Sequence, residues 1–410
     1  MIKRKILVSA LIAGGFVSPM AFATNGMLPI GYGLKSEGMG GAGIALPQDA
    51  LAAATNPAGM VMVGDRIDIG VEWFKPNRST TIANAGAFGN GSYSGNGKSN
   101  FIIPQFGYNK MVSSDTSLGV SVFGNGGMNT QYNTNPFANL GGSGAAGVNL
   151  EQLFIAPTWA MKVNPDNAIG VSLNLAYQRF SATGLQGFAA QSTNGASFQN
   201  AGTDTSTGYG LRLGWTGKVS SAVTLGATYQ TKTKMSSFSK YSGLFANQGN
   251  FDIPANYGVG IAVKASPATT VAFDVERIMY GGVPSIGDTY TAGQIFGSTN
   301  GPGFGWKNIN AYKLGVSYAY DSTLTLRAGV DHCDNPVQSS QVMLNILAPG
   351  VIQDHLSLGA TWTLADKSEI TVGYVHSFQN SVSGTIPTAF GGGNATLSMS
   401  QDAIGVSYGW

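Results

Sequence analysis

Apolar and polar residues alternate with a period of two along much of the chain. In the clearest case, residues 310–320, the large apolar side chains share one face: Tyr312, Leu314, Val316, Tyr318 and Tyr320. Small or polar residues occupy the other face, as in a strand with one apolar surface. Because aromatic residues stand at both ends of the apolar face and aliphatic residues in its middle, this strand is predicted to cross a membrane with its rings at the two interfaces.

Fourteen segments show this kind of pattern. They cover residues 65–76, 100–112, 117–127, 148–162, 167–180, 207–219, 223–237, 253–265, 269–280, 310–320, 324–333, 354–364, 368–378 and 398–410. Six connections between them are short, and seven are long and rich in Gly, Asn and Ser. An even number of strands, with short periplasmic turns and long outer loops, is typical of bacterial outer-membrane barrels. We therefore predict an all-β fold, a transmembrane 14-stranded antiparallel β-barrel, over residues 65–410.

Composition argues against other classes of protein. Only 42 of the 410 residues are charged, 22 basic and 20 acidic, while 59 are Gly. This charged share is well under half of the roughly 25% usual in soluble domains. The chain has 20 Phe, 16 Tyr and 6 Trp, which argues against disorder. After residue 23 it has no apolar run near the roughly 20 residues that a membrane-spanning helix needs.

The first 23 residues are predicted to be a signal peptide. Lys3, Arg4 and Lys5 precede an apolar run over residues 6–17, and Ala21-Phe22-Ala23 forms an A-x-A cleavage site. Removing three basic residues lowers the net charge from +2 to −1. Because phosphate binding needs a clustered basic surface, no nucleic-acid partner is expected. The single cysteine, Cys333, excludes a disulfide scaffold.

Residues 24–64, the hatch segment, are predicted to fill the barrel. A fourteen-stranded barrel encloses more space than the side chains of its wall can occupy. The hatch segment lacks strand alternation and is rich in Gly and Ala. Its Gly38-Met39-Gly40-Gly41-Ala42-Gly43 matches the dinucleotide-binding pattern G-x-G-x-x-G, but no apolar strand precedes it and no βαβ unit follows. We interpret these glycines as positions of close backbone packing in a crowded lumen.

Several motifs carry a family resemblance. They are the glycine-rich 38–43 segment, Asp49-Ala50, Asn56-Pro57-Ala58-Gly59-Met60 and Gly303-Phe304-Gly305-Trp306. With them, the chain from residue 24 onward resembles the outer-membrane long-chain fatty acid transporter family, FadL/TodX type. The resemblance implies a hatch inside the barrel and a kink in the third strand that opens a passage through the wall. It also implies passive uptake of hydrophobic molecules by capture, hatch rearrangement and lateral exit.

The third predicted strand contains a candidate gate. It runs from Ser117 into Gly124, Asn125, Gly126 and Gly127. Glycines weaken a strand and permit bulges, so a break in the ladder is also expected on physical grounds. The resemblance implies that the hatch residues Asn56, Pro57 and Ala58 pack against this kink. A merely flexible strand end beside the 128–147 loop is the alternative.

Two long loops are candidates for ligand capture. In the resembled family an apolar groove is formed by two outer loops, which correspond here to residues 181–206 and 238–252. The second loop carries side chains at spacings that place them on one stripe of a short amphipathic helix: Phe238, Tyr241, Leu244 and Phe245. The first loop contributes Leu185, Phe188 and Phe198. An exposed apolar stripe marks a binding site, and packing against a neighbouring loop is the alternative.

A ligand with a carboxylate head group would need a cation in the lumen. Strand parity places Arg212, Lys313 and Arg327 on the inner face. The same parity brings three acidic residues to that face: Asp274, Glu276 and Asp331. Each cation is therefore either a head-group contact or a member of an ion pair.

Catalysis is not expected. His332, His355 and His376 fall on separate strands, only His355 faces inward, and no metal-ligand spacing or nucleophile elbow occurs. No metal or cofactor is therefore predicted. The expected partners are a hydrophobic small molecule, outer-membrane lipid and the barrel-assembly machinery. The aromatic residue Trp410 at the end of the last strand resembles the signal that this machinery reads. The protein is expected to be a monomer. A polar-solute porin and a structural surface barrel remain alternatives.

Overall fold

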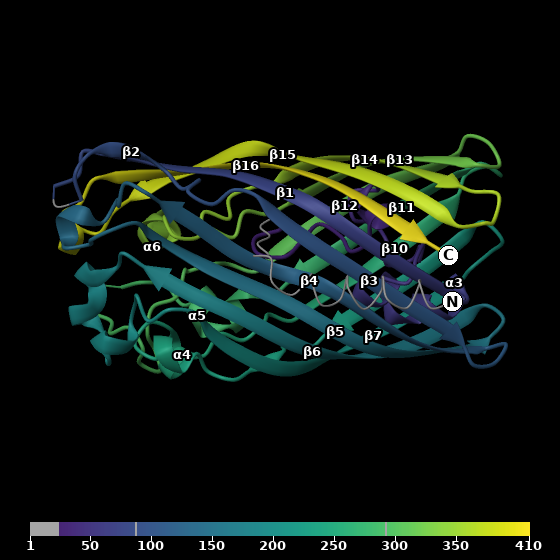
Figure 1. The fold of residues 1–410 in the computed structure, drawn as a ribbon, viewed down its shortest axis with the longest axis horizontal. Helices are drawn as coiled ribbons and strands as arrows, with labels where there is room; N and C mark the ends of the chain where they lie inside the picture. Colours follow the sequence, from purple (N-terminus) through teal and green to yellow (C-terminus); the bar gives the residue numbers. More distant parts are fainter. Residues whose placement is uncertain (1–23, 87, 292) are drawn as a thin grey trace.

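The computed structural model describes residues 24–410 except residues 87 and 292. Within these residues, sixteen strands form one sheet, and the last strand pairs with the first to close it. Two short strands only extend the edges of others, so fourteen strands make the closed wall. All pairings between neighbouring wall strands are antiparallel, and Figure 1 shows the long tilted strands of the wall. The predicted fourteen-stranded barrel is confirmed. The predicted signal peptide, residues 1–23, lies outside the described residues.

The wall strands and the two short strands have the following bounds. They are β1 (Arg66–Ala83), β2 (Gly91–Ser94), β3 (Phe101–Met111), β4 (Thr116–Tyr132), β5 (Ala146–Asn164), β6 (Asn167–Thr183), β7 (Asp204–Lys218), β8 (Val223–Gln230), β9 (Lys234–Met235), β10 (Asn256–Lys264), β11 (Thr269–Ile278), β12 (Ile309–Ala319), β13 (Leu324–Cys333), β14 (Asp354–Thr363), β15 (Glu369–Thr385) and β16 (Asn394–Gly409). The short strands are β2 and β9.

The described helices are short and lie in the hatch segment or the long loops. The α-helices are α2 (Leu34–Glu37), α3 (Met60–Val63), α4 (Ala246–Gly249), α5 (Pro284–Gly287) and α6 (Val342–Asn345). The 3₁₀ helices are η1 (Ala52–Ala54), η2 (Pro57–Gly59), η3 (Ala138–Leu140), η4 (Gln186–Gln191), η5 (Gly195–Ser197), η6 (Ser239–Tyr241), η7 (Tyr280–Gly282), η8 (Ser339–Gln341) and η9 (Thr388–Phe390). In the described part of the chain, none of the helices is both long enough and apolar enough to span a membrane.

Side chains alternate between the lumen and the outer surface, as predicted. On β12, Leu314 is 44% exposed on the outer face, whereas Lys313 is buried on the inner face. The other apolar residues predicted to face lipid from this strand are also exposed: Tyr312, Val316 and Tyr318. An apolar outer surface with a polar inner surface is what a strand between lipid and a filled lumen requires.

One predicted strand is wrong at its outer end. The sequence pattern predicts a strand over 223–237, but β8 ends at Gln230 and the chain then crosses the inner face of β7, where β9 pairs. Gly208 and Gly210 on β7 permit this crossing, because a side chain at either position would overlap the 233–235 backbone or side chains. Backbone proximity at glycines, which alternation does not reveal, therefore ends this strand early.

The hatch segment lies inside the barrel and is anchored to the inner wall. The carboxylate of Asp274 on β11 accepts hydrogen bonds from the backbone N–H groups of Gly43 at 2.7 Å and Ile44 at 2.9 Å. Side chains added at Gly315 or Gly329 of the wall would overlap the hatch backbone at residue 39. Gly40 and Gly41 have φ of 68° and 81°, a turn that favours glycine. The interpretation of the glycine-rich motif as close backbone packing is confirmed.

The long loops fold over the opposite end of the lumen. Their apolar side chains form one large buried cluster with residues of the wall and the first residues of the hatch segment. In this cluster, Tyr280 donates a hydrogen bond to the carbonyl of Asn25 and accepts one from the backbone N–H of Met27. The lumen is therefore filled from both ends, by the hatch segment and by the loops.

Candidate functional site

The third wall strand, β4, is broken at the predicted glycines. Its pairing with β5 shifts register between Gly124 and Gly126, which leaves Asn125 as the extra residue of a bulge. Gly126 has a φ of 154°, and a side chain there would meet the carbonyl oxygen of Met27. The predicted break in the ladder is confirmed, and the alternative of a merely flexible strand end does not describe this geometry.

The wall has a gap beside this bulge. β3 pairs with β4 only from Phe106 onward, so Phe101–Gln105 of β3 and Phe123–Thr130 of β4 face each other without ladder hydrogen bonds. We call these two unpaired edges the wall gap. Beyond it, the chain around Gly95 again bonds to the backbone of Gln131. Because unpaired backbone groups are costly within a membrane, other parts of the molecule must cover these edges.

The start of the hatch segment covers the β4 edge of the wall gap. The N–H of Gly127 donates a hydrogen bond to the carbonyl of Met27 at 3.1 Å. The hydroxyl of Tyr32 donates to the amide oxygen of Asn125 at 3.1 Å, and the Tyr32 ring meets the Phe123 ring edge to face, with centroids 4.8 Å apart. The hatch segment thus supplies partners for the groups that the bulge leaves unpaired.

The predicted contact between Asn56-Pro57-Ala58 and the kink is wrong. Asn56 donates hydrogen bonds to the carbonyls of Ile44 at 2.7 Å and Trp215 at 3.0 Å, and Trp215 belongs to β7. The turn that begins with Pro57 packs against Gly170 of β6 and Gly214 of β7. These wall glycines have no side chain and leave room for the rigid turn, so the motif docks there instead of at β4.

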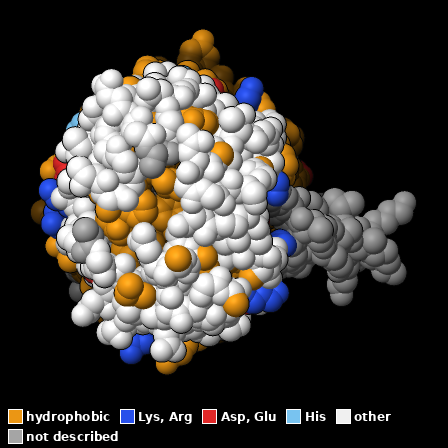
Figure 2. Space-filling model, turned by 90° about the vertical axis from the view of Figure 1, so that its left-hand side faces the viewer, with side chains coloured by type: hydrophobic (Ala, Val, Ile, Leu, Met, Phe, Trp, Pro, Cys, Tyr) orange, Lys and Arg blue, Asp and Glu red, His pale blue; other side chains and the backbone are white. Residues whose placement is uncertain are grey.

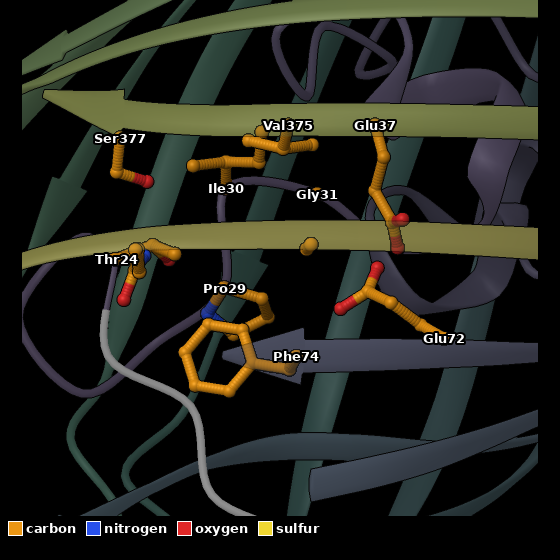
Figure 3. A pocket seen from close by; sticks show the side chains of 11 residues that line it. Thr24, Pro29, Ile30, Gly31, Glu37, Glu72, Phe74, Val375 and Ser377 are labelled. Atoms are coloured by element: carbon orange, nitrogen blue, oxygen red, sulfur yellow. The ribbon is translucent and has the colours of Figure 1, made fainter. Parts of the chain in front are cut away.

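Apolar side chains surround the inner mouth of the wall gap. Phe101 and Ile103 of β3 pack with Phe74 of β1 and Ile30 of the hatch segment. A small cavity of about 20 Å³ lies beside them, between the hatch segment and strands β1, β15 and β16 (Figure 3). A cavity of this size holds about one water molecule, so the hatch segment and the wall are closely packed here.

Two carboxyl groups face each other at the edge of this cavity. Glu37 of α2 and Glu72 of β1 point toward one another in Figure 3, and both are buried. The amide of Gln105 donates a hydrogen bond to Glu37 at 2.9 Å. Burial, together with the neighbouring Glu72, raises the pKa of Glu37 well above its usual value. A protonated Glu37 can be buried at much lower cost than a carboxylate.

The loop residues predicted to capture ligand are packed in the buried cluster. Leu185, Phe188, Phe198, Phe238, Tyr241 and Phe245 are buried, and Leu244 is half-buried against the same cluster. The predicted amphipathic helix is wrong: a short η6 turn is followed by α4, in which Asn247 and Gln248 have positive φ. The two loops contact each other, because Gly243 donates to the Ser197 carbonyl at 2.9 Å. The stripe is therefore a packing surface, which was the alternative interpretation.

The loop end of the barrel nevertheless has an apolar recess. Figure 2 shows hydrophobic side chains gathered in a hollow in the middle of this face, surrounded by backbone and by side chains that are neither hydrophobic nor charged, with Lys and Arg toward the periphery. On this side, Ile295, in the loop between β11 and β12, is 43% exposed. An apolar recess of this kind provides a landing surface for a hydrophobic molecule.

The three predicted lumen cations face inward, as expected, and each contacts the wall or the hatch segment. Lys313 forms an ion pair with Glu276 at 2.6 Å. Arg212 donates to the Thr55 carbonyl at 2.9 Å, and Arg327 donates to the Gln48 amide oxygen at 2.9 Å. These cations therefore hold the hatch segment and the inner wall in place.

The histidines agree with their predicted orientation. The side chain of His355 is fully buried, and its Nδ1 lies 2.8 Å from the carboxylate of Asp331, whereas His332 and His376 lie on the outer surface. Cys333 is a buried free thiol. In the part of the chain that the structure describes, no group of three His, Cys, Asp or Glu side chains is arranged to hold a metal.

Three residues at the wall gap were missed by sequence reasoning. Met27 and Tyr32 have no distinguishing pattern in the sequence. Arg78 lies on β1 and faces the lumen, but the predicted strand 65–76 ends before it. Pro76 and Asn77 are residues that often end a strand. In the structure, Pro76 lies between the part of β1 that pairs with β3 and the part that pairs with β2, and a strand tolerates proline at such an unpaired edge. Continuing the inward alternation of Asp68 and Glu72 could have found Arg78.

Comparisons with known proteins agree with this architecture. A model of a family described as outer membrane protein transport protein (OMPP1/FadL/TodX) matches residues 16–409. The structure resembles that of a Pseudomonas aeruginosa FadL homologue, with a TM-score of 0.73 and 17% identity over 94% of this chain and 99% of the other. It also resembles the P. putida toluene transporter TodX, with a TM-score of 0.67 and 20% identity over 93% and 98%. The Ralstonia pickettii toluene transporter TbuX is similar as well, with a TM-score of 0.66 and 18% identity over 93% of this chain and 98% of the other.

No curated protein matches the chain. The structural matches share too little sequence to support more than the fold. The family model, in contrast, covers nearly the whole sequence, including both the hatch segment and the wall. On that basis the chain is a protein of the bacterial outer membrane and belongs to the OMPP1/FadL/TodX family of outer membrane transport proteins.

Proposed function

We propose that this protein carries hydrophobic small molecules, either long-chain fatty acids or related hydrocarbons, passively across the outer membrane. The molecule lands on the apolar recess of the loop end, enters the lumen, and leaves sideways through the wall gap after the hatch segment moves. The observation that carries this proposal is the wall gap, whose inner mouth is lined by apolar side chains of both the wall and the hatch segment. No step breaks a covalent bond, so the protein acts without catalysis.

The gate comprises Gly124, Asn125, Gly126 and Gly127 together with Met27 of the hatch segment. The hydrogen bond between the Gly127 N–H and the Met27 carbonyl closes one edge of the wall gap, and breaking it frees that edge. The hatch motif Asn56-Pro57-Ala58 anchors the other part of the hatch segment to β6 and β7. One end of the hatch segment can therefore move while the other end stays docked.

Capture at the loop end requires the packed loop cluster to loosen. The aromatic side chains of the second loop pack around Phe180, which lies 4.6 Å from Phe245 and 4.8 Å from Tyr241 between ring centroids, whereas Phe188 and Phe198 of the first loop pack against Phe296. A hydrophobic ligand can replace such contacts with contacts of its own, at little cost in buried apolar area. Leu185, Phe188, Phe198, Phe238 and Leu244 are proposed to line the space opened in this way.

Residues 1–23 are proposed to act as the signal peptide and residues 24–64 as the hatch. The barrel of residues 65–410 is proposed to assemble as a monomer with the help of the barrel-assembly machinery. Outer-membrane lipid surrounds the apolar outer face, and the ligand that leaves the wall gap passes into it.

Conductance in planar bilayers tests the proposal against a polar-solute porin. The intact protein should be nearly silent, because the hatch segment and loops fill its lumen, whereas deletion of residues 27–62 should produce an open, weakly selective pore. Large steady currents through the intact protein would favour the porin. An unchanged conductance after deletion would show that the hatch segment does not block the lumen. Transfer of radiolabelled oleate and toluene into liposomes completes the test, because a structural surface barrel transfers neither.

A further inference from the structure

A buried arginine bridges the two sides of the wall gap from the lumen side. Arg78 projects into the lumen from β1 and is only 2% exposed. Its Nη1 donates to the carbonyl of Asn129 on β4 at 2.5 Å and lies 3.2 Å from the Asn129 amide oxygen, and its Nη2 donates to the carbonyl of Lys98. Lys98 precedes β3, so the guanidinium joins the two sides of the wall gap through backbone carbonyls.

Arg78 lacks the charge compensation that the other lumen cations have. Lys313 is paired with Glu276, Glu276 also acts electrostatically on Arg212, and Asp49 acts on Arg327. Within residues 24–410 without 87 and 292, no carboxylate forms an ion pair with Arg78, and its Nε has no hydrogen-bond partner. A buried cation without an opposite charge is costly and attracts an anion.

The surroundings of Arg78 suit an apolar tail. Ile82, Met128 and Tyr132 lie in the same buried cluster as Met27, and Thr80 beside Arg78 on the inner face bonds to Tyr132. A molecule that places an anionic head at Arg78 therefore meets apolar side chains along the path to the β4 edge. This combination selects an amphipathic acid over a neutral hydrocarbon.

We propose that Arg78 is the head-group site of the wall gap and that the preferred ligands are hydrophobic monocarboxylates. The ligand carboxylate replaces the carbonyls of Asn129 and Lys98 as the hydrogen-bond acceptor of the guanidinium, because a bidentate charge-assisted pair is stronger than hydrogen bonds to neutral carbonyls. The link that Arg78 makes between the two edges of the wall gap is then broken, while the backbone bonds between Gly95, Gly97 and Gln131 remain. The inference rests on the proposed function and adds to it the class of substrate and the contact that releases the gate.

Binding of oleate and of its methyl ester to the detergent-purified full chain tests the site. The two probes share the apolar tail and differ in head-group charge. Arg78→Gln should weaken oleate binding by about tenfold to a hundredfold, the range expected for a lost charge-assisted bond. Binding of the ester should change by less than about twofold, because the ester does not need the cation. Lys75→Gln removes a charge from the outward face of the same strand and should change neither.

A second variant tests the site where the Arg78 variant does not assemble. Asn129→Asp places a carboxylate beside the guanidinium, where the Asn129 amide oxygen now lies 3.2 Å away. The new carboxylate competes with the ligand, so oleate binding should again fall by about tenfold or more while ester binding is retained.

The outcomes separate this inference from the proposed function. Equal loss of oleate and ester binding in both variants would show that Arg78 only supports the wall, and the head-group site would be wrong while hydrophobic uptake stands. If the unaltered protein binds neither probe, the head-group site is wrong, and the proposed function fails as well if the liposome assay shows transfer of neither oleate nor toluene. Unchanged oleate binding in a correctly assembled Arg78→Gln variant also overturns the head-group site.

Discussion

Replacing Gly126 by alanine should detach the start of the hatch segment from the wall gap. An added Cβ at this position would lie 2.2 Å from the carbonyl oxygen of Met27, and real Cβ atoms are essentially never found within 3.0 Å of another heavy atom. The two groups must therefore separate by at least 0.8 Å. The neighbouring hydrogen bond from the Gly127 N–H to the same oxygen, 3.1 Å long, is strained or lost by that movement.

The expected magnitude follows from that one hydrogen bond. Its net contribution is about 0.5–1.5 kcal/mol, and each 1.4 kcal/mol corresponds to about a factor of ten in population. The population with the hatch start detached should therefore rise by about twofold to about tenfold. A larger rise would mean that the buried carbonyl of Met27 finds no new partner.

Labelling of a cysteine at position 27 measures this population. Met27 is fully buried, so Met27→Cys, in a chain whose single native cysteine is replaced by Cys333→Ala, reacts with a small maleimide mainly when the segment detaches. Adding Gly126→Ala should increase the labelling rate by the factor above. Gly282→Ala is the matched control, because a Cβ there meets no atom within 4 Å. A Gly126→Ala rate equal to that of the control would refute the role of the Met27 contact.

Three further changes test how the hatch segment is anchored. Asn56→Ala removes three side-chain hydrogen bonds, two of them to carbonyl groups outside its own turn, and Asp274→Ala leaves two hatch N–H groups without their carboxylate. Each change should lower the stability of the docked hatch by about 1–3 kcal/mol. The measurement is faster proteolysis within residues 24–64, with Asp321→Ala in an exposed turn as control. If either variant is cleaved at the rate of the control, the residue changed in that variant does not anchor the hatch segment. Glu37→Gln should remove a pH dependence of the same proteolysis. Burial and Glu72 raise the pKa of Glu37 in the docked state. The contribution of Glu37 to docking stability is therefore fully present below the ordinary pKa of 4.5 and is lost as the pH rises through the raised pKa. An equal pH dependence in the variant, measured from about pH 4 to about pH 9, would show that the dependence does not come from Glu37.

The sequence by itself determined the wall of this protein. Alternation with a period of two depends only on neighbouring residues, and it placed Leu314 toward lipid and Lys313 toward the lumen. The glycines of β4 predicted the bulge for a similarly local reason, since a strand without side chains loses its preference for regular pairing. The positions of the long loops and of the hatch segment followed from where alternation stops.

The tertiary structure decided which surfaces meet inside that wall. Asn56-Pro57-Ala58 docks on β6 and β7, and Met27 and Tyr32 take the predicted place at β4, because glycines on distant strands determine where a backbone can approach closely. The loop aromatics are buried for a related reason. Their spacing specified an apolar stripe, but the surface that covers it comes from loops far away in the sequence. The position of Arg78 at the wall gap follows only from the tertiary structure, since a gap between strands depends on how β3 and β4 pair and not on either strand alone.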